Sequence, residues 1–115
     1  MMLTRQEIFD KAWSGLEFQG FRRSATSAGC AYRGDGGLRC ALGWLIPDER
    51  YHHSLEGRGV GEPEVLNATG ISHEDADFAI ALQGVHDFAR GATEMERRLL
   101  AFARKHDLAI PGERP

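Results

Sequence analysis

GCAYRGDGGLRCALGWLIPDERY, residues 29–51, is the stretch around which the rest of the chain is organised. It holds both cysteines, one of the two tryptophans and five of the fourteen glycines. Its first half contains Asp35-Gly36, a pair that favours a β-hairpin because a type I′ turn needs φ above zero at both central residues. We predict a small β-hairpin near residues 30–41. Its register stays open, because a two-residue loop places Cys30 opposite Ala41, whereas a three-residue loop places it opposite Cys40.

The second half of this stretch, ALGWLI at residues 41–46, is nearly all apolar and ends at Pro47. A run of this length fits either a buried strand or a buried helical turn, and periodicity alone does not separate the two. We favour the helical turn, because its bulky residues would then fall on adjoining faces. Pro47 followed by two acidic residues would open the next turn.

Capping signals predict three main helices outside this stretch. Each helix starts with a side chain that can accept from the first free backbone N–H groups. The pairs are Thr4 with Glu7, Ser72 with Asp75, and Thr93 with Glu96. The second of these helices has an inner apolar stripe at positions 78, 82, 85 and 89, widened by positions 81 and 88. A short helix from Pro63 to about Thr69 precedes it, closed by Gly70.

These elements predict an α+β fold that is mostly α. Three main helices and one or two short helices surround one core, with the hairpin near residues 30–41 beside them. The chain has 115 residues, of which 42% are hydrophobic, and we expect one compact domain over residues 1–111 with a disordered tail at 112–115. No apolar run reaches the roughly 18 residues of a membrane span. We therefore expect a cytoplasmic protein with no membrane partner.

The net charge of −3 and the pI of about 5.9 bound the class of partner. Direct binding of nucleic acid usually leaves a basic footprint, which the overall composition lacks. The composition therefore argues against a nucleic-acid-binding protein.

Four side chains offer ligands that zinc accepts, and they are Cys30, Cys40, His52 and His53. Structural zinc sites usually contain a close Cys-x2–4-Cys pair, and these two cysteines lie farther apart. Adjacent histidines also reach one ion together only with difficulty. We expect two reduced, buried thiols and no cofactor, and we keep a zinc-stapled structural module as an alternative.

A cysteine nucleophile is the other chemical alternative. Cys40 follows a glycine-rich turn and could open a helix, a position that lowers the pKa of a thiol. His86 could serve as its base, with Gln83 one turn earlier and Asp87 beside it. The segment LRCAL matches no hydrolase signature. We expect no catalytic residue, and the alternative is a cysteine-dependent hydrolase or transferase that uses Cys40 and His86.

One motif has the form GLxCAxGxLIPDExY and runs from Gly37 to Tyr51. Tyr32-Arg33 stands before it, and Leu82-Gln83 and His86-Asp87 follow later. With these residues the chain resembles a family of small uncharacterised proteins of phages and bacteria, over roughly residues 30–57 and 78–90. The resemblance supplies no catalytic or binding residue. It implies a phage or prophage accessory protein that would work in the host cytoplasm.

Small size, net acidity, the missing catalytic signature and this resemblance lead to one functional expectation. We predict a phage-type accessory protein that binds and inhibits a host protein or protein complex. Its most specific version is an anti-CRISPR inhibitor of a CRISPR–Cas complex. The candidate protein-binding residues are charged and aromatic side chains of the central stretch and the loop after it, namely Arg33, Asp35, Arg39, Asp48, Glu49, Tyr51 and Arg58.

Overall fold

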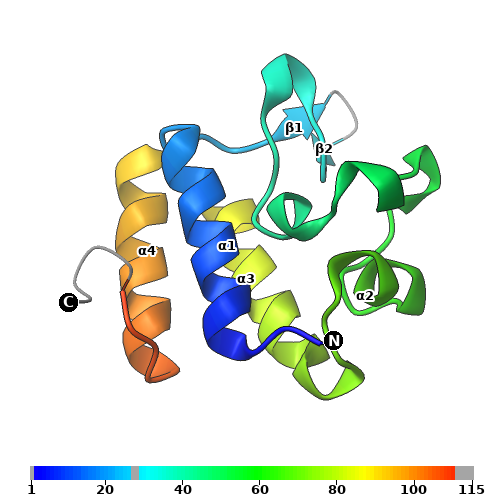
Figure 1. The fold of residues 1–115 in the computed structure, drawn as a ribbon. Helices are drawn as coiled ribbons and strands as arrows, with labels where there is room; N and C mark the ends of the chain where they lie inside the picture. The colour runs from blue at the N-terminus through cyan, green and yellow to red at the C-terminus, as the bar shows by residue number, and fades with distance from the viewer. Residues whose placement is uncertain (1, 27–28, 111–115) are drawn as a thin grey trace.

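The computed structural model describes residues 2–26 and 29–110 (Figure 1). Four helices dominate it, and they are α1 (Arg5–Phe18), α2 (Pro63–Thr69), α3 (Ala76–Phe88) and α4 (Ala92–Lys105). The three long helices, α1, α3 and α4, pack together in one half of the molecule (Figure 1). The other half consists of α2 and an irregular segment that joins it to α1. Among the described residues, no helix is long and apolar enough to cross a membrane.

Phe102 of α4 lies where the three long helices meet. Its ring stacks on that of Phe9 in α1, with the centroids 6.2 Å apart, and lies 5.2 Å from the ring of Phe78 in α3. Phe9 and Phe78 are buried, with exposed fractions of 0% and 3%. Burying a side chain of this size contributes about 1.5–3 kcal/mol. This aromatic cluster therefore fixes α1, α3 and α4 against one another.

The irregular segment is built from short 3₁₀ turns. They are η1 (Asp35–Gly37), η2 (Leu42–Leu45), η3 (Asp48–Arg50) and η4 (His53–Leu55), and a fifth, η5 (His73–Asp75), precedes α3. The helical turn predicted over residues 41–46 is confirmed as η2. η2 packs against α1, where the indole of Trp44 fills the space that a Cβ at Gly15 would need.

The predicted fold class and its β-hairpin near residues 30–41 are wrong. The described chain is mostly helical, and the flanks of residues 34–37 share one isolated bridge, Arg33 with Arg39. Gly36 and Gly37 do have positive φ angles of 71° and 79°, so the glycines make a tight turn without strands on either side. Cys30 pairs with Ala25 in a two-residue antiparallel pair, β1 (Ala25–Thr26) with β2 (Gly29–Cys30).

Side chains from distant parts of the chain explain why no hairpin forms. The backbone N–H groups of Tyr32 and Arg33 donate to the two carboxylate oxygens of Glu56, at 3.0 and 3.1 Å. On the other flank, the N–H of Arg39 donates to Oε1 of Gln19 at 3.0 Å. These donors would otherwise pair across a hairpin ladder. The segment is therefore held by side-chain acceptors in place of a sheet.

The three predicted capping pairs have different outcomes. Ser72 makes no side-chain capping bond, and α3 starts only at Ala76, after η5. Thr4 forms the predicted box at the start of α1, since its hydroxyl accepts from the N–H of Glu7 at 3.1 Å and Glu7 accepts from the N–H of Thr4 at 2.8 Å. The box at Thr93 is wrong. α4 starts at Ala92, with Gly91 as its N-cap, so Thr93 already lies inside the first turn.

Candidate functional site

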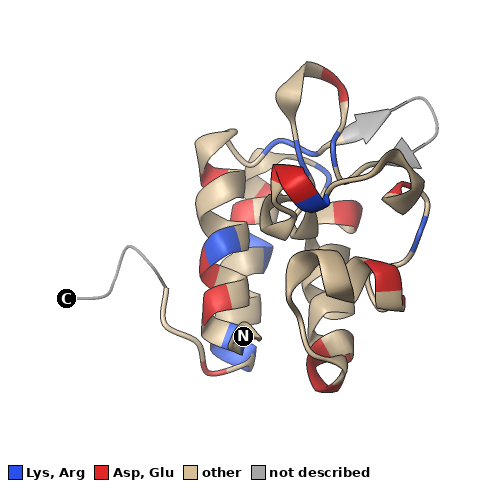
Figure 2. Cartoon of the chain, turned by 45° about the vertical axis from the view of Figure 1, so that its right-hand side comes forward, with Lys and Arg blue, Asp and Glu red and all other residues tan. Residues whose placement is uncertain are grey.

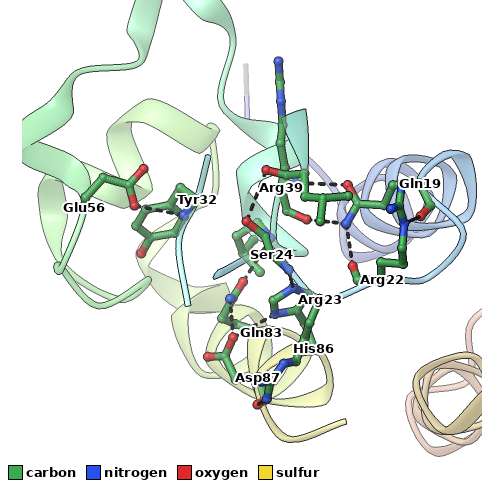
Figure 3. A network of polar contacts seen from close by, with 12 residues as sticks. Gln19, Arg22, Arg23, Ser24, Tyr32, Arg39, Glu56, Gln83, His86 and Asp87 are labelled. Atoms are coloured by element: carbon green, nitrogen blue, oxygen red, sulfur yellow. Dashed lines mark hydrogen bonds and ion pairs between the residues drawn. The ribbon is translucent and has the colours of Figure 1, made fainter. Parts of the chain in front are cut away.

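A polar network on α3 contains three of the residues considered for catalysis (Figure 3). Gln83 accepts from the backbone N–H of Leu42 at 3.1 Å and donates to Oδ1 of Asp87 at 2.9 Å. His86 Nδ1 lies 2.9 Å from the same Asp87 oxygen. The backbone N–H of Ser24 donates to His86 Nε2 at 2.9 Å. The network therefore joins α3 to η2 and to the segment that follows α1.

These contacts assign the tautomer of His86. Nε2 accepts a hydrogen bond from a backbone amide, so it carries no proton. Nδ1 then carries the proton and donates a hydrogen bond to Oδ1 of Asp87. The side chain is fully buried, with an exposed fraction of 0%. The lone pair that a general base would need is therefore occupied by the Ser24 amide.

Cys40 is buried beside this network, with 1% of its surface exposed. Burial raises the pKa of its thiol to about 12, although hydrogen bonds with the Gly43 backbone and the Gln83 side chain act in the opposite direction. The reactive form of cysteine is the thiolate, and a thiol with this pKa is protonated at neutral pH. In the described part of the chain, no hydrogen bond joins Cys40 to His86. The geometry does not assemble a nucleophile with its base.

We expect Cys40 to react at least about 100-fold more slowly than free cysteine with a disulfide-exchange reagent at pH 7, because both burial and a raised pKa suppress the thiolate. The measurement is the rate of labelling in a Cys30→Ser variant, which retains one thiol. Adding denaturant to the same sample should restore the ordinary rate and serves as the control. Labelling of the folded protein at the rate of free cysteine would contradict this placement of Cys40.

The structure describes the side chains of three of the residues considered for zinc, Cys40, His52 and His53, and does not bring these three together. Among the described residues, no three histidine, cysteine, aspartate or glutamate side chains gather in a group that could hold a metal ion. Cys40 is buried, whereas His52 and His53 are exposed. His52 uses Nδ1 to accept from the N–H of Ser54 at 3.1 Å, which caps η4. The side chain of Cys30 lies outside the described part.

Several candidate protein-binding residues form one surface cluster. The guanidinium of Arg33 lies over the ring of Tyr51, 4.3 Å from its centroid. Arg33 also donates to the carbonyl oxygen of Ile46 at 3.1 Å and to Asp48 at 2.7 Å. Arg39 lies 3.7 Å from the same Asp48 oxygen. These contacts stabilise the irregular segment. Some of the hydrogen-bonding capacity and charge of these side chains is therefore already used within the chain.

The remaining candidates lie apart from that cluster or at its edge. Asp35 and Glu49 are exposed. Arg58 forms ion pairs with Glu62 at 3.3 Å and with Glu64 at 3.6 Å. Of these three, Arg58 lines the cavity described next.

A cavity of about 720 Å³ opens between α3 and the loop formed by residues 56–62. Tyr32, Cys40 and Gln83 line it. All three are buried residues, with exposed fractions of 6%, 1% and 9%. The cavity therefore reaches from the surface down to the network on α3.

Three residues of α3 form one wall of this cavity, and they are Ile80, Gly84 and Phe88. Their spacing of four residues puts them on one face of the helix. Ile80 and Phe88 remain 50% and 73% exposed, and a carbon of the Phe88 ring lies 3.8 Å from where a Cβ of Gly84 would stand. We call this wall and the facing loop the α3 groove.

The facing wall is the glycine-rich loop. The carboxylate of Glu62 accepts from the N–H of Gly59 at 2.7 Å, which closes the loop on itself. The hydroxyl of Tyr32 donates to the carbonyl oxygen of Arg58 at 2.6 Å, which ties the loop to the floor of the cavity. These two bonds give the loop a defined shape although it has no helix or strand.

Sequence reasoning missed the α3 groove. It placed Phe88 on the inner stripe of its helix, whereas the side chain points to solvent at the end of α3. The spacing of Ile80, Gly84 and Phe88 was a usable signal, because an apolar pair at i and i+8 with glycine midway is separate from the buried stripe.

No family model matches the chain, and no curated protein and no solved structure is significantly similar to it.

Proposed function

We propose that this protein acts by binding another protein, and that the α3 groove is the surface that contacts it. The observation that carries the proposal is the exposure of Ile80 and Phe88, at 50% and 73%, at two places along one wall of a cavity. Large apolar side chains that rim a concave surface are typical of sites that a partner covers.

The state of Cys40 and His86 supports binding over catalysis. The thiol is buried and protonated, and the imidazole lone pair is taken by a backbone amide. Both groups stabilise the irregular half of the molecule from within.

The more specific version of the proposal is an inhibitor of phage type that binds a host protein or complex in the host cytoplasm, with an anti-CRISPR protein as the sharpest form. Its support is the resemblance in the motif from Gly37 to Tyr51, together with the small size and the net charge of −3. An inhibitor of this kind needs no cofactor and no catalytic group, only a surface that blocks its target.

We expect affinity capture from a bacterial host lysate to retain one stoichiometric protein, identified by mass spectrometry. Retention should be lost with the double variant Ile80→Ser and Phe88→Ser, because it removes the apolar rim of the α3 groove. The matched control is Phe18→Ser, which removes an aromatic side chain that is 84% exposed on α1. Equal retention by all three proteins, or no retained protein, would contradict the proposal.

The anti-CRISPR version has its own readout. Expression of the protein should raise the plating efficiency of a phage that the host CRISPR–Cas complex targets, and the groove double variant should abolish this rise. If a partner is retained but the protein has no effect on plating, the proposed binding function stands and the anti-CRISPR version is rejected.

A further inference from the structure

A second cavity, of about 540 Å³, shares Phe88 as a lining residue with the α3 groove. Its lining includes three arginines, Arg22, Arg23 and Arg90, together with Phe88 and Met95. None of the residues that line it is acidic. We call it the arginine pocket. Because Phe88 lines both cavities, the two hollows adjoin and a single ligand can reach both.

The positive charge of the arginine pocket is not neutralised from within the described chain. Arg22 donates to the carbonyl oxygen of Gln19 at 3.0 Å, and Arg23 donates to that of Asp87 at 2.9 Å. Both bonds hold a guanidinium in place without a counter-charge. Across the described residues, none of the three arginines forms an ion pair with a carboxylate, unlike Arg58.

Two acidic residues lie near the arginine pocket in the sequence, Asp87 and Glu94. The carboxylate of Asp87 accepts from Gln83 at 2.9 Å and lies 2.9 Å from His86 Nδ1, within the network on α3. Glu94, in the first turn of α4, pairs with Arg98 one turn later at 2.7 Å. Charges of both signs are spread over the rest of the molecule (Figure 2), and the chain as a whole carries −3. An uncompensated group of three guanidiniums beside an exposed aromatic ring therefore favours an anionic group on the partner.

We infer that the partner inserts a segment in which a bulky apolar residue lies next to acidic residues. The apolar side chain fills the α3 groove against Ile80 and Phe88, and the carboxylates enter the arginine pocket. The two kinds of residue lie close together in the partner's sequence, because a single side chain lines both cavities. This inference rests on the proposed function and names the chemistry of the partner at that same surface.

Selection from a displayed library of random dodecapeptides tests this inference directly on the surface of the folded protein. We expect enriched peptides to carry a bulky apolar residue beside aspartate or glutamate. Fluorescence anisotropy with a labelled, enriched peptide then measures the effect of Arg90→Glu, which should weaken binding by at least about tenfold. Arg90 is exposed and carries none of the backbone hydrogen bonds that Arg22 and Arg23 make. Arg97→Glu, the same charge reversal on the exposed side of α4, should leave binding unchanged.

Several outcomes would overturn the inference. Enrichment of basic peptides, no enrichment, or binding that is insensitive to Arg90→Glu would each do so. Binding of a single-stranded thymidine oligonucleotide that depends on Phe88 and Arg90, with no peptide bound, would assign the surface to nucleic acid instead. If Arg90→Glu retains the partner captured from lysate while the groove double variant loses it, the proposed function stands and the acidic segment does not.

Discussion

Replacing Gly43 with alanine is expected to lower the free energy of unfolding by about 3 kcal/mol, the upper part of the range for overpacking a close-packed site. A Cβ at this position would overlap the backbone carbonyl oxygen of Tyr32. Backbone atoms cannot rotate away as the end of a flexible side chain can. Both residues are buried, with Tyr32 6% exposed, so neither backbone can relieve the overlap by moving into solvent.

The effect should spread beyond one contact. The two neighbours of Gly43 make contacts of their own. The backbone N–H of Leu42 donates to Gln83, and the indole of Trp44 fills the space beside Gly15. Any shift of η2 that relieves the overlap moves at least one of these contacts. The expected loss is a large fraction of the roughly 5–15 kcal/mol that stabilises a typical domain.

Urea unfolding followed by circular dichroism measures this change, and Gly59→Ala is its control. Gly59 is exposed, and the nearest atom to a Cβ there is a flexible carboxylate oxygen of Glu62 at 3.7 Å. The control should change the free energy of unfolding by no more than about 0.5 kcal/mol. Equal stability of Gly43→Ala and Gly59→Ala would show that the approach of η2 to Tyr32 is not close.

Local signals in the sequence are sufficient for much of the helical frame. The Thr4 capping box marks the start of α1, and Pro63 marks the first residue of α2. A glycine inside the pattern of α1, Gly15, also indicates close packing, and the indole of Trp44 lies against it. Each of these features depends on residues within one or two turns of the chain, or on the small size of one residue.

The hairpin prediction is wrong because the competing acceptors are distant in sequence. Asp35-Gly36 does make a turn. The N–H groups on its flanks, however, donate to Glu56 and Gln19, which lie 20 to 24 residues away from the donors along the chain. No local pattern indicates that a carboxylate or an amide will replace a strand. Gln83 reaches Leu42 across 41 residues in the same way.

The residues considered for chemistry are only partly brought together by the fold. Cys40, Gln83 and Asp87 do line one cavity, and His86 lies beside Asp87. Composition and spacing suggest a reactive set, but burial decides the state of the thiol and hydrogen bonding decides that of the imidazole. Neither quantity can be derived from the order of residues alone.

Replacing His86 with leucine is expected to lower the free energy of unfolding by about 3 kcal/mol, because a buried polar network loses its central member. The volume of the side chain is nearly kept, so the loss comes from the network. The buried N–H of Ser24 loses its acceptor, which by itself costs about 1–3 kcal/mol, and Asp87 loses a donor. Because the polar groups of such a network polarise one another, the loss of stability can exceed the sum of the two hydrogen bonds counted separately.

His86→Gln separates this structural role from a catalytic one. The amide oxygen of glutamine can approach the place of Nε2 and accept from Ser24, so about half of the lost stability should return. His73→Leu, at an exposed histidine in η5, should change the free energy of unfolding by less than about 0.5 kcal/mol. Once folded, His86→Gln should still retain the captured partner, because His86 serves the interior and not the α3 groove. If instead both His86 variants kept the wild-type stability and lost all biological activity, His86 would be acting as a chemical group, and Cys40 would return as its partner.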